Sequence, residues 1–413
     1  MYRWNVRCRW RDVWGFVLLA GLLASACGGD PPADEKEAEE SPADLCDDRP
    51  VLGSAGSYTM ERAVLSASEL RGGLVFQVPE DLVSTIVTVN SPGGMVLWNR
   101  GAIDRLVLST ALDIFGARSA TRAMPGFAHV SSYLYPNNEV TRSELGRCLR
   151  LSPLVVGGGD VELTVTTVRR PERALGQVLD LQLRVLDGSV SDEEIVEIVA
   201  SVQSVFSQAC TDEHCLDVRF EPEFLRMTSE SGTGVVEVDE LFSLDSDFAV
   251  LARMEGPDSR ALNVVLVESL EMSLLDEDLT LLGLAGGIPS SPFDGTVGSS
   301  LVINVEAHRT VEGQLWDGFI GSTIAHEVGH MMGLFHTTEQ DGRGFDPLED
   351  TAECPAGSFD ANDDGRVDVH ECQGAGADNL MFWMASLDSL SRLTLGQSDV
   401  LRSHPLVYGV HEP

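Results

Sequence analysis

Three histidines lie within one eleven-residue stretch of this sequence, His326-Glu327-Val328-Gly329-His330-Met331-Met332-Gly333-Leu334-Phe335-His336. His326 and His330 are four residues apart, so on a helix both imidazoles lie on one face and can reach the same metal ion. His336 would point away from them if the helix continued. The helix must therefore end, and Gly333 is the residue that can adopt a positive φ and turn the chain back.

Three neutral imidazoles leave the fourth position of a tetrahedral zinc ion to water, which is the arrangement of catalytic zinc. Glu327 follows the first ligand, where its carboxylate can take a proton from that water and pass it to a leaving amine. The alternative is three ordinary core histidines, but three of only nine histidines fall in this window. We therefore predict that His326, His330 and His336 bind zinc and that Glu327 is the general base.

The pattern H-E-x-x-H-x-x-G-x-x-H resembles the metzincin zinc metalloendopeptidases. Metzincins carry a Met-turn beneath the zinc, and Asp378-Asn379-Leu380-Met381-Phe382 is similar to it, with Met381 as the methionine. Residues 333–337 and 346–355 are similar to the pappalysin-like branch. Trp383 stands where several metzincins place a tyrosine near the metal, so a tyrosine role is not carried over. The resemblance covers residues 175–413 at most and implies hydrolysis of peptide bonds in protein or peptide substrates.

The same resemblance implies that the segment before the zinc helix lines the cleft. Residues 283–297 are the expected edge, to which a substrate would add as an antiparallel strand. The Gly and Pro content of this segment suits a plain loop equally well.

A second predicted metal site lies between the zinc ligands and the Met-turn. Residues 360–371 match the calcium-loop pattern D-x-[DN]-x-[DN]-G-x5-E at every position. The expected calcium ligands are Asp360, Asn362, Asp364, the Arg366 carbonyl, Asp368 and bidentate Glu371. Without long flanking helices, the role would be structural; the alternative is an acidic surface turn that holds no ion.

The first fifty residues indicate export. Residues 1–26 combine four arginines with an apolar run from Val13 to Ala26, as in a signal peptide. Small residues directly before Cys27 fit a bacterial lipobox, so we expect Cys27 to be lipidated and residues 27–50 to form an acidic flexible tether. The protein would then be exported and lipid-anchored, in the outer membrane or at the cell surface; plain secretion is the alternative.

The remaining chain divides near Pro171. Residues 51–170 contain short β-type runs at 74–78, 85–89 and 161–166. After Pro171, strands are expected at 178–185, 216–220, 262–267 and 301–305, with a helix that starts at a capping box, Ser191-Asp192-Glu193-Glu194. The predicted architecture is multi-domain: a β-sandwich-like N-terminal domain, 51–170, followed by an α/β (α+β) metzincin-type zinc peptidase domain, 171–413.

The cysteines suit an oxidising compartment. With Cys27 lipidated and the signal peptide removed, six remain, and Cys354–Cys372, Cys210–Cys215 and Cys46–Cys148 are the suggested pairs. A different possibility is that Cys148 caps the zinc as an inhibitory thiolate.

The net charge of −37 argues against nucleic acid as a partner. The functional alternative to a peptidase is a non-catalytic surface-binding lipoprotein whose metal sites are structural. An intact Glu327 argues against it, because a purely structural zinc site takes a fourth protein ligand and needs no base.

Overall fold

The computed structural model describes residues 46, 49–53, 56–104, 106–110, 120–121, 123–125, 129–143, 146–157, 159–211, 214–221, 224–228, 234–237, 250–251, 260–271, 280–291, 298–385 and 391–410. All of them belong to one compact unit, Pro42–Pro413. The predicted signal segment 1–26, the lipidation site Cys27 and most of the predicted tether lie outside the described residues. Within the described part of the chain, no helix has both the length and the apolar character needed to cross a membrane.

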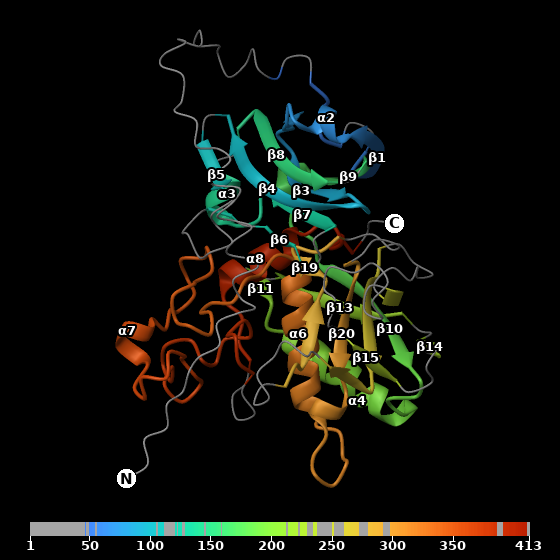
Figure 1. Cartoon of the computed structure of the whole chain (residues 1–413), viewed down its shortest axis with the longest axis vertical. Coiled ribbons are helices and arrows are strands. Elements are labelled where there is room, and N and C mark those ends of the chain that lie inside the picture. Colours follow the sequence, from blue (N-terminus) through green and yellow to red (C-terminus); the bar gives the residue numbers. More distant parts are fainter. Residues whose placement is uncertain are drawn as a thin grey trace. The chain divides into compact units, whose positions relative to one another are not determined.

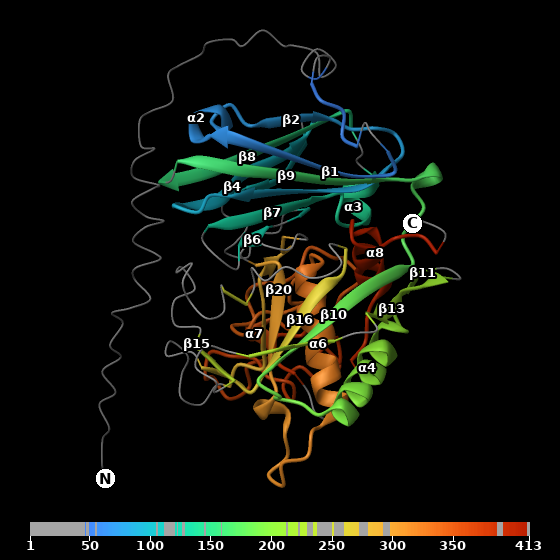
Figure 2. The ribbon, with the colours of Figure 1, turned by 90° about the vertical axis from the view of Figure 1, so that its right-hand side faces the viewer.

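Two antiparallel sheets form the N-terminal part. One has the strand order β1-β9-β3-β7 and the other β2-β8-β4-β5. Side chains from both sheets, such as Val87 and Phe76, belong to one hydrophobic core, and Figure 2 shows the strands of the two sheets in adjacent layers. The strands are β1 (Tyr58–Ser66), β2 (Leu74–Gln77), β3 (Leu82–Asn90), β4 (Gly94–Ile103), β5 (Leu106–Thr110), β7 (Val130–Tyr135), β8 (Cys148–Gly157) and β9 (Asp160–Arg169). Two short helices, α2 (Ala67–Leu70) and α3 (Glu139–Ser143), and the two-residue strand β6 (Met124–Pro125) lie between them.

The folded N-terminal part begins before the predicted boundary at residue 51. Cys46 is disulfide-bonded to Cys148, with a Cα–Cα distance of 5.8 Å. The pairing excludes Cys148 as a zinc-capping thiolate, so that possibility was wrong. The bond also joins residue 46 to the first residue of β8. Both half-cystines are buried.

A mostly parallel sheet is the centre of the C-terminal part, with the order β13-β10-β16-β20-β18 and with β14 also paired to β10. All pairs in it are parallel except β18 with β20. Every residue of β16 is buried, as expected for a central strand covered on both faces. The strands are β10 (Val178–Leu186), β13 (Asp217–Phe220), β14 (Leu225–Met227), β16 (Leu262–Val267), β18 (Gly283–Ala285) and β20 (Ser300–Asn304). Five short strands of the described C-terminal part lie outside this sheet: β11 (Cys210–Thr211), β12 (His214–Cys215), β15 (Val235–Glu237), β17 (Ser269–Glu271) and β19 (Gly287–Ile288).

Two long helices, α4 (Asp192–Phe206) and α6 (Asp317–Met331), pack together against this sheet (Figure 1). The predicted capping box starts α4: Ser191 Oγ accepts from the Glu194 N–H at 3.2 Å, and Glu194 Oε2 accepts from the Ser191 N–H at 2.8 Å. The two helices approach closely at Gly321, where a Cβ would lie 2.0 Å from Ser201 Oγ. Contacts with the sheet and with α4 therefore fix the position of α6.

The chain after α6 contains little regular structure. It includes α7 (Ala356–Phe359) and α8 (Leu395–Ser403), while the 3-10 turns η2 (Pro171–Arg173) and η3 (Glu306–His308) occur earlier. Cys354–Cys372 closes the segment that holds the predicted calcium loop, and Cys210–Cys215 closes the β11–β12 hairpin. The three suggested disulfide pairs are thus all confirmed.

Candidate metal centre

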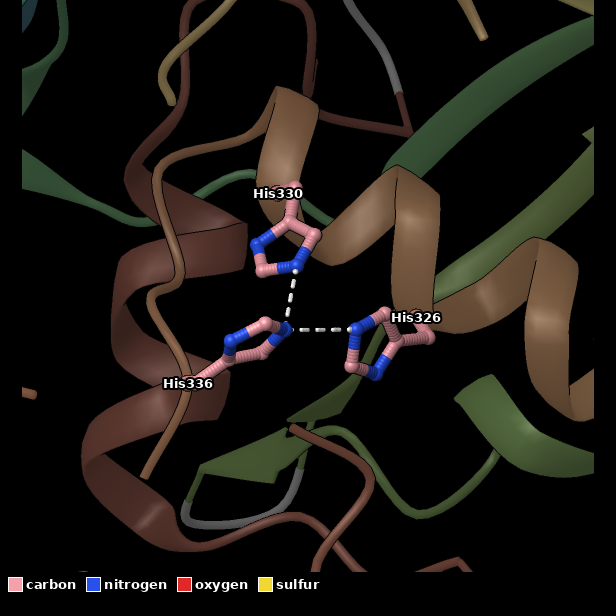
Figure 3. Close-up of side chains that lie close together, drawn as sticks. All are labelled: His326, His330 and His336. Carbon is pink, nitrogen blue, oxygen red and sulfur yellow. Dashed lines mark hydrogen bonds between the residues drawn. The ribbon is translucent and has the colours of Figure 1, made fainter. Parts of the chain in front are cut away.

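Helix α6 and the turn after it bring three histidines together. His326 and His330 lie one turn apart on α6, which ends at Met331. Gly333 has φ +104°, and the chain reverses there as predicted. His336 Nε2 then lies 3.2 Å from His326 Nε2 and 3.1 Å from His330 Nε2. Figure 3 shows the three rings turned toward one another; we call them the histidine triad.

The Nδ1 atom of each ring in the triad has its own acceptor. His326 Nδ1 donates to the Leu380 carbonyl at 2.7 Å and His330 Nδ1 to the Leu334 carbonyl at 2.8 Å. His336 Nδ1 donates to Glu339 Oε2 at 2.9 Å. Carbonyl and carboxylate oxygens only accept, so these bonds place the proton of each neutral ring on Nδ1 and leave a lone pair on each Nε2.

Three lone pairs facing one another at these distances repel unless a cation lies between them. Zinc bound by histidine has Zn–N distances of about 2.0–2.1 Å, so tetrahedral ligand nitrogens are about 3.3 Å apart. The Nε2 contacts of 3.1 and 3.2 Å in the triad are close to that spacing. Within the described residues, the triad is the one group of three or more His, Cys, Asp or Glu side chains with ligand atoms within 4.8 Å of each other. The residues therefore fit zinc.

The electrostatic environment keeps two of these imidazoles neutral, as ligation requires. Burial lowers the pKa of His326 to about 3, and the neighbouring His336 acts in the same direction. Burial also puts the pKa of His330 well below its usual value, with His326 and His336 lowering it further. A neutral imidazole offers its lone pair to a metal without first losing a proton.

Glu327 lies beside the triad, in contact with the edge strand β18. Its side chain is 8% exposed. Burial raises the pKa of its carboxyl to about 8, and a hydrogen bond from the Ala285 N–H acts in the opposite direction. A Cβ at Gly283 would lie 2.9 Å from Glu327 Cγ, so a glycine is needed for β18 to pass this closely. Glu327 and the triad line the same cavity, of about 570 Å³.

Met381 packs against α6, the helix that carries His326 and His330. It is fully buried, and a Cβ at Gly329 would lie 2.7 Å from its Sδ. The adjacent Leu380 supplies the carbonyl that accepts from His326. Asn379 Oδ1 accepts from the Met381 N–H at 2.8 Å and from Gln397 Nε2 at 2.9 Å, so the turn is fastened to the start of α8.

Side-chain oxygens of the predicted calcium loop accept hydrogen bonds from backbone N–H groups of the same loop. Asp360 accepts hydrogen bonds from the N–H groups of Asp364 and Gly365. Glu371 Oε1 accepts from residues 361 and 362, and Asn362 Oδ1 accepts from Asp364. The remaining predicted ligands, Arg366 and Asp368, lie in the same loop. The carboxylates of this loop do not form a group of three within 4.8 Å, so calcium stays a prediction.

Sequence reasoning missed the groups that orient the site. Glu339 and Gln397 were not identified, and Met124, which lines the cavity from the N-terminal part, was not either. Glu339 is three residues after His336, which was a usable signal for a carboxylate partner. Trp383 also lines the cavity, and its Nε1 donates to the Val367 carbonyl at 2.7 Å. The predicted edge 283–297 forms two short strands, β18 and β19 (Gly287–Ile288), while residues 292–297 lie outside the described part.

No protein-family model matches this sequence, and neither does any curated protein. Among solved structures, mirolysin in complex with compound 9 matches with a TM-score of 0.36 and 18% identity, covering 55% of this chain and 91% of that chain. Archaemetzincin from Archaeoglobus fulgidus, complexed with malonate, gives a TM-score of 0.26 and 14% identity over 40% of this chain and 86% of its own. Metalloproteinase-II from Bacteroides fragilis gives a TM-score of 0.30 and 12% identity, covering 59% of this chain and 63% of that chain. These TM-scores are low, so the functional conclusion rests on the site itself.

Proposed function

We propose that this protein is a zinc-dependent endopeptidase of the metzincin type that hydrolyses peptide bonds of extracytoplasmic proteins. One observation carries the proposal: three Nε2 lone pairs converge at 3.1–3.2 Å in a cavity that Glu327 also lines. The buried Met381 beneath α6 and the chain reversal at Gly333 support the metzincin type. The pappalysin-like branch rests on the sequence of residues 333–337 and 346–355.

The residues divide the chemistry between them. Zinc, when bound, lowers the pKa of water and polarises a peptide carbonyl. The triad would hold the metal through the Nε2 atoms of its three imidazoles. Glu327 accepts the proton of the attacking water and passes it to the leaving amine. Its closeness to β18 puts this proton transfer beside the strand edge along which a peptide would bind.

The cellular setting follows from the sequence. Export with lipidation at Cys27, and the tether after it, would hold the enzyme at the outer membrane or cell surface, with secretion as the alternative. Three disulfides in the described residues are consistent with an oxidising compartment. The N-terminal sheets, which share one core, support a sandwich-like accessory domain. Calcium in loop 360–371 is proposed on the sequence pattern alone.

The test separates metal binding from catalysis. We expect Glu327→Gln to keep stoichiometric zinc but to lose about 10²–10⁴-fold in kcat/KM on a denatured protein substrate, because the base is gone and the ligands remain. Glu312→Gln is the matched control, since Glu312 is exposed and does not line the cavity. Zinc content comes from elemental analysis and cleavage from mass spectrometry. Zinc binding without any cleavage by the wild-type protein would favour the non-catalytic binding protein instead.

A further inference from the structure

The cavity that contains the triad has a wall that comes from the N-terminal part. Strand β6 pairs antiparallel with β19, with Ile288 opposite Met124 and Gly287 opposite Pro125. Met124 is 42% exposed, and it lines the cavity together with Ile288 and the three histidines. The N-terminal part therefore contributes to the region where a substrate would bind, about 200 residues away in sequence from the zinc ligands.

Strand β18 offers the rest of that edge. It pairs with β20 on one side, and its other side has no strand partner in the described part of the chain. The Leu282 carbonyl accepts from the Asn304 N–H at 2.9 Å on the β20 side, so the backbone groups of Gly283 and Ala285 point to the second side. The proposed base lies next to this strand, since a Cβ at Gly283 would lie 2.9 Å from Glu327 Cγ. A peptide that adds to β18 thus has its reacting bond next to residues 283–285.

Strand β19 continues the same run of chain only two residues after Ala285. Gly286 has the backbone of Gly298 on one side, so close that a Cβ would lie 2.2 Å from the Gly298 carbonyl oxygen. Strand β6 lies on the cavity side of β19, because Met124 lines the same cavity as Gly287, Ile288 and residues 283–285 of β18.

Direct contacts hold the sheet that contains β3 and β9 against the C-terminal part. Ser84 Oγ on β3 donates to the Ser403 carbonyl. Arg170 Nη2, just after β9, donates to the Val407 carbonyl at 2.7 Å. All four residues are buried. Such bonds, made between buried groups, are costly to break, and the pairing of β6 with β19 keeps Met124 at the cavity.

The direction of a bound peptide determines which of its ends meets β6. A substrate antiparallel to β18 has its N-terminal residues toward β19. Because β6 is itself antiparallel to β19, it runs in the same direction as that substrate. It takes the position beside β19 that the upstream residues of a longer substrate would need. The Cα atoms of Ala285 and Gly287 are separated by two residues, or about 7 Å of strand. That leaves edge for about two substrate residues before β6 is reached.

We propose that β6 ends the substrate-binding edge on the upstream side of the reacting bond, and that Met124 determines specificity at the last upstream subsite. This inference rests on the proposed peptidase function and adds to it a substrate class: peptides that engage the enzyme through at most about two residues before the cleaved bond and through a longer stretch after it.

Two peptide series test the proposal. A peptide cleaved by the zinc-loaded full-length protein is mapped by mass spectrometry and resynthesised with one to five residues before the bond, or one to five after it. We expect kcat/KM to stop rising after about two upstream residues and to continue rising with downstream residues. A continued rise through five upstream residues, or saturation on the downstream side instead, would overturn the proposal.

Variants of Met124 locate the subsite. We expect Met124→Ala to change the preference between a large apolar residue and alanine at the second upstream position by about tenfold in kcat/KM, with no change at downstream positions. Leu106→Ala is the matched control, because Leu106 is similarly exposed on β5 but does not line the cavity. An unchanged upstream preference in Met124→Ala would overturn the inference and leave the peptidase function standing. No cleavage of any peptide by the wild-type protein would overturn both.

Discussion

Replacement of Gly333 by alanine tests the chain reversal on which the metal site depends. Gly333 has φ +104°, a region that residues with a Cβ rarely adopt, and holding alanine there costs about 1–3 kcal/mol. A Cβ would also lie 3.2 Å from Leu134 Cδ2 on β7, which is tight but leaves room for a small shift. We therefore expect the free energy of unfolding to fall by about 2 kcal/mol, which lowers Tm by about 4–8 °C.

The same substitution reports on the metal. The chain can relieve the strain only by changing the path between Met331 and His336, which moves the third imidazole. If this movement weakens the free energy of zinc binding by about 1.4 kcal/mol, zinc affinity falls about tenfold. Thermal unfolding with and without zinc measures the first effect, and competition with a chromophoric chelator measures the second.

Two other glycines are controls for this experiment. Gly313 has φ +82°, and a Cβ added to it would meet open space, so Gly313→Ala should lower Tm and leave zinc affinity unchanged. Gly318 is the second residue of α6, also with open space and without a positive φ, so Gly318→Ala should not lower Tm. A Gly333→Ala variant with the Tm and the zinc affinity of the wild type would refute the reasoning.

Two further predictions concern stability. Arg309 donates to Glu194 at 2.6 Å and lowers the pKa of its carboxyl; this stabilisation is present above the unfolded-state pKa and is lost as pH falls through the lower folded-state pKa. Glu194→Gln should therefore lose about 0.5–1 kcal/mol in urea unfolding near neutral pH and progressively less as the pH falls below the unfolded-state pKa; an equal loss at neutral and at acid pH would contradict the charge argument. Calcium at about ten times its Kd should stabilise the wild type by about 1.4 kcal/mol and Asp364→Ala much less, as measured by melting curves; an unchanged wild-type curve would rule out the loop as a calcium site.

Local patterns predicted the elements that depend on neighbouring residues. The capping box at Ser191 and the apolar stripe after it predicted α4, and the apolar run 262–267 predicted the buried strand β16 with its observed bounds. Strands β1, β4 and β8 were not identified, because polar, glycine or proline residues interrupt their apolar residues, so they show neither a continuous apolar run nor a regular alternation. Their pairing with distant partners, such as β4 with β8, stabilises them.

In the candidate site, too, some groups are predictable from consecutive residues and others are not. The spacing of the three histidines and the glycine before the last one specifies a metal site through helix geometry and one positive φ, and both can be read from consecutive residues. The orienting groups come from elsewhere: the Leu380 carbonyl for His326, Gln397 for Asn379, and Glu339 for His336. A carbonyl has no sequence signature, since every residue carries one.

The atoms that can bind zinc and the carboxylate that can serve as the base are predictable from residue types at short, regular spacings. The groups that surround them depend on long-range packing. The two residues of β6 have no pattern of their own, yet pairing with β19 brings Met124 into the cavity of the histidine triad. Contacts between residues far apart in the chain depend on how whole sheets pack, and that packing results from many burial and hydrogen-bond terms that no short segment contains.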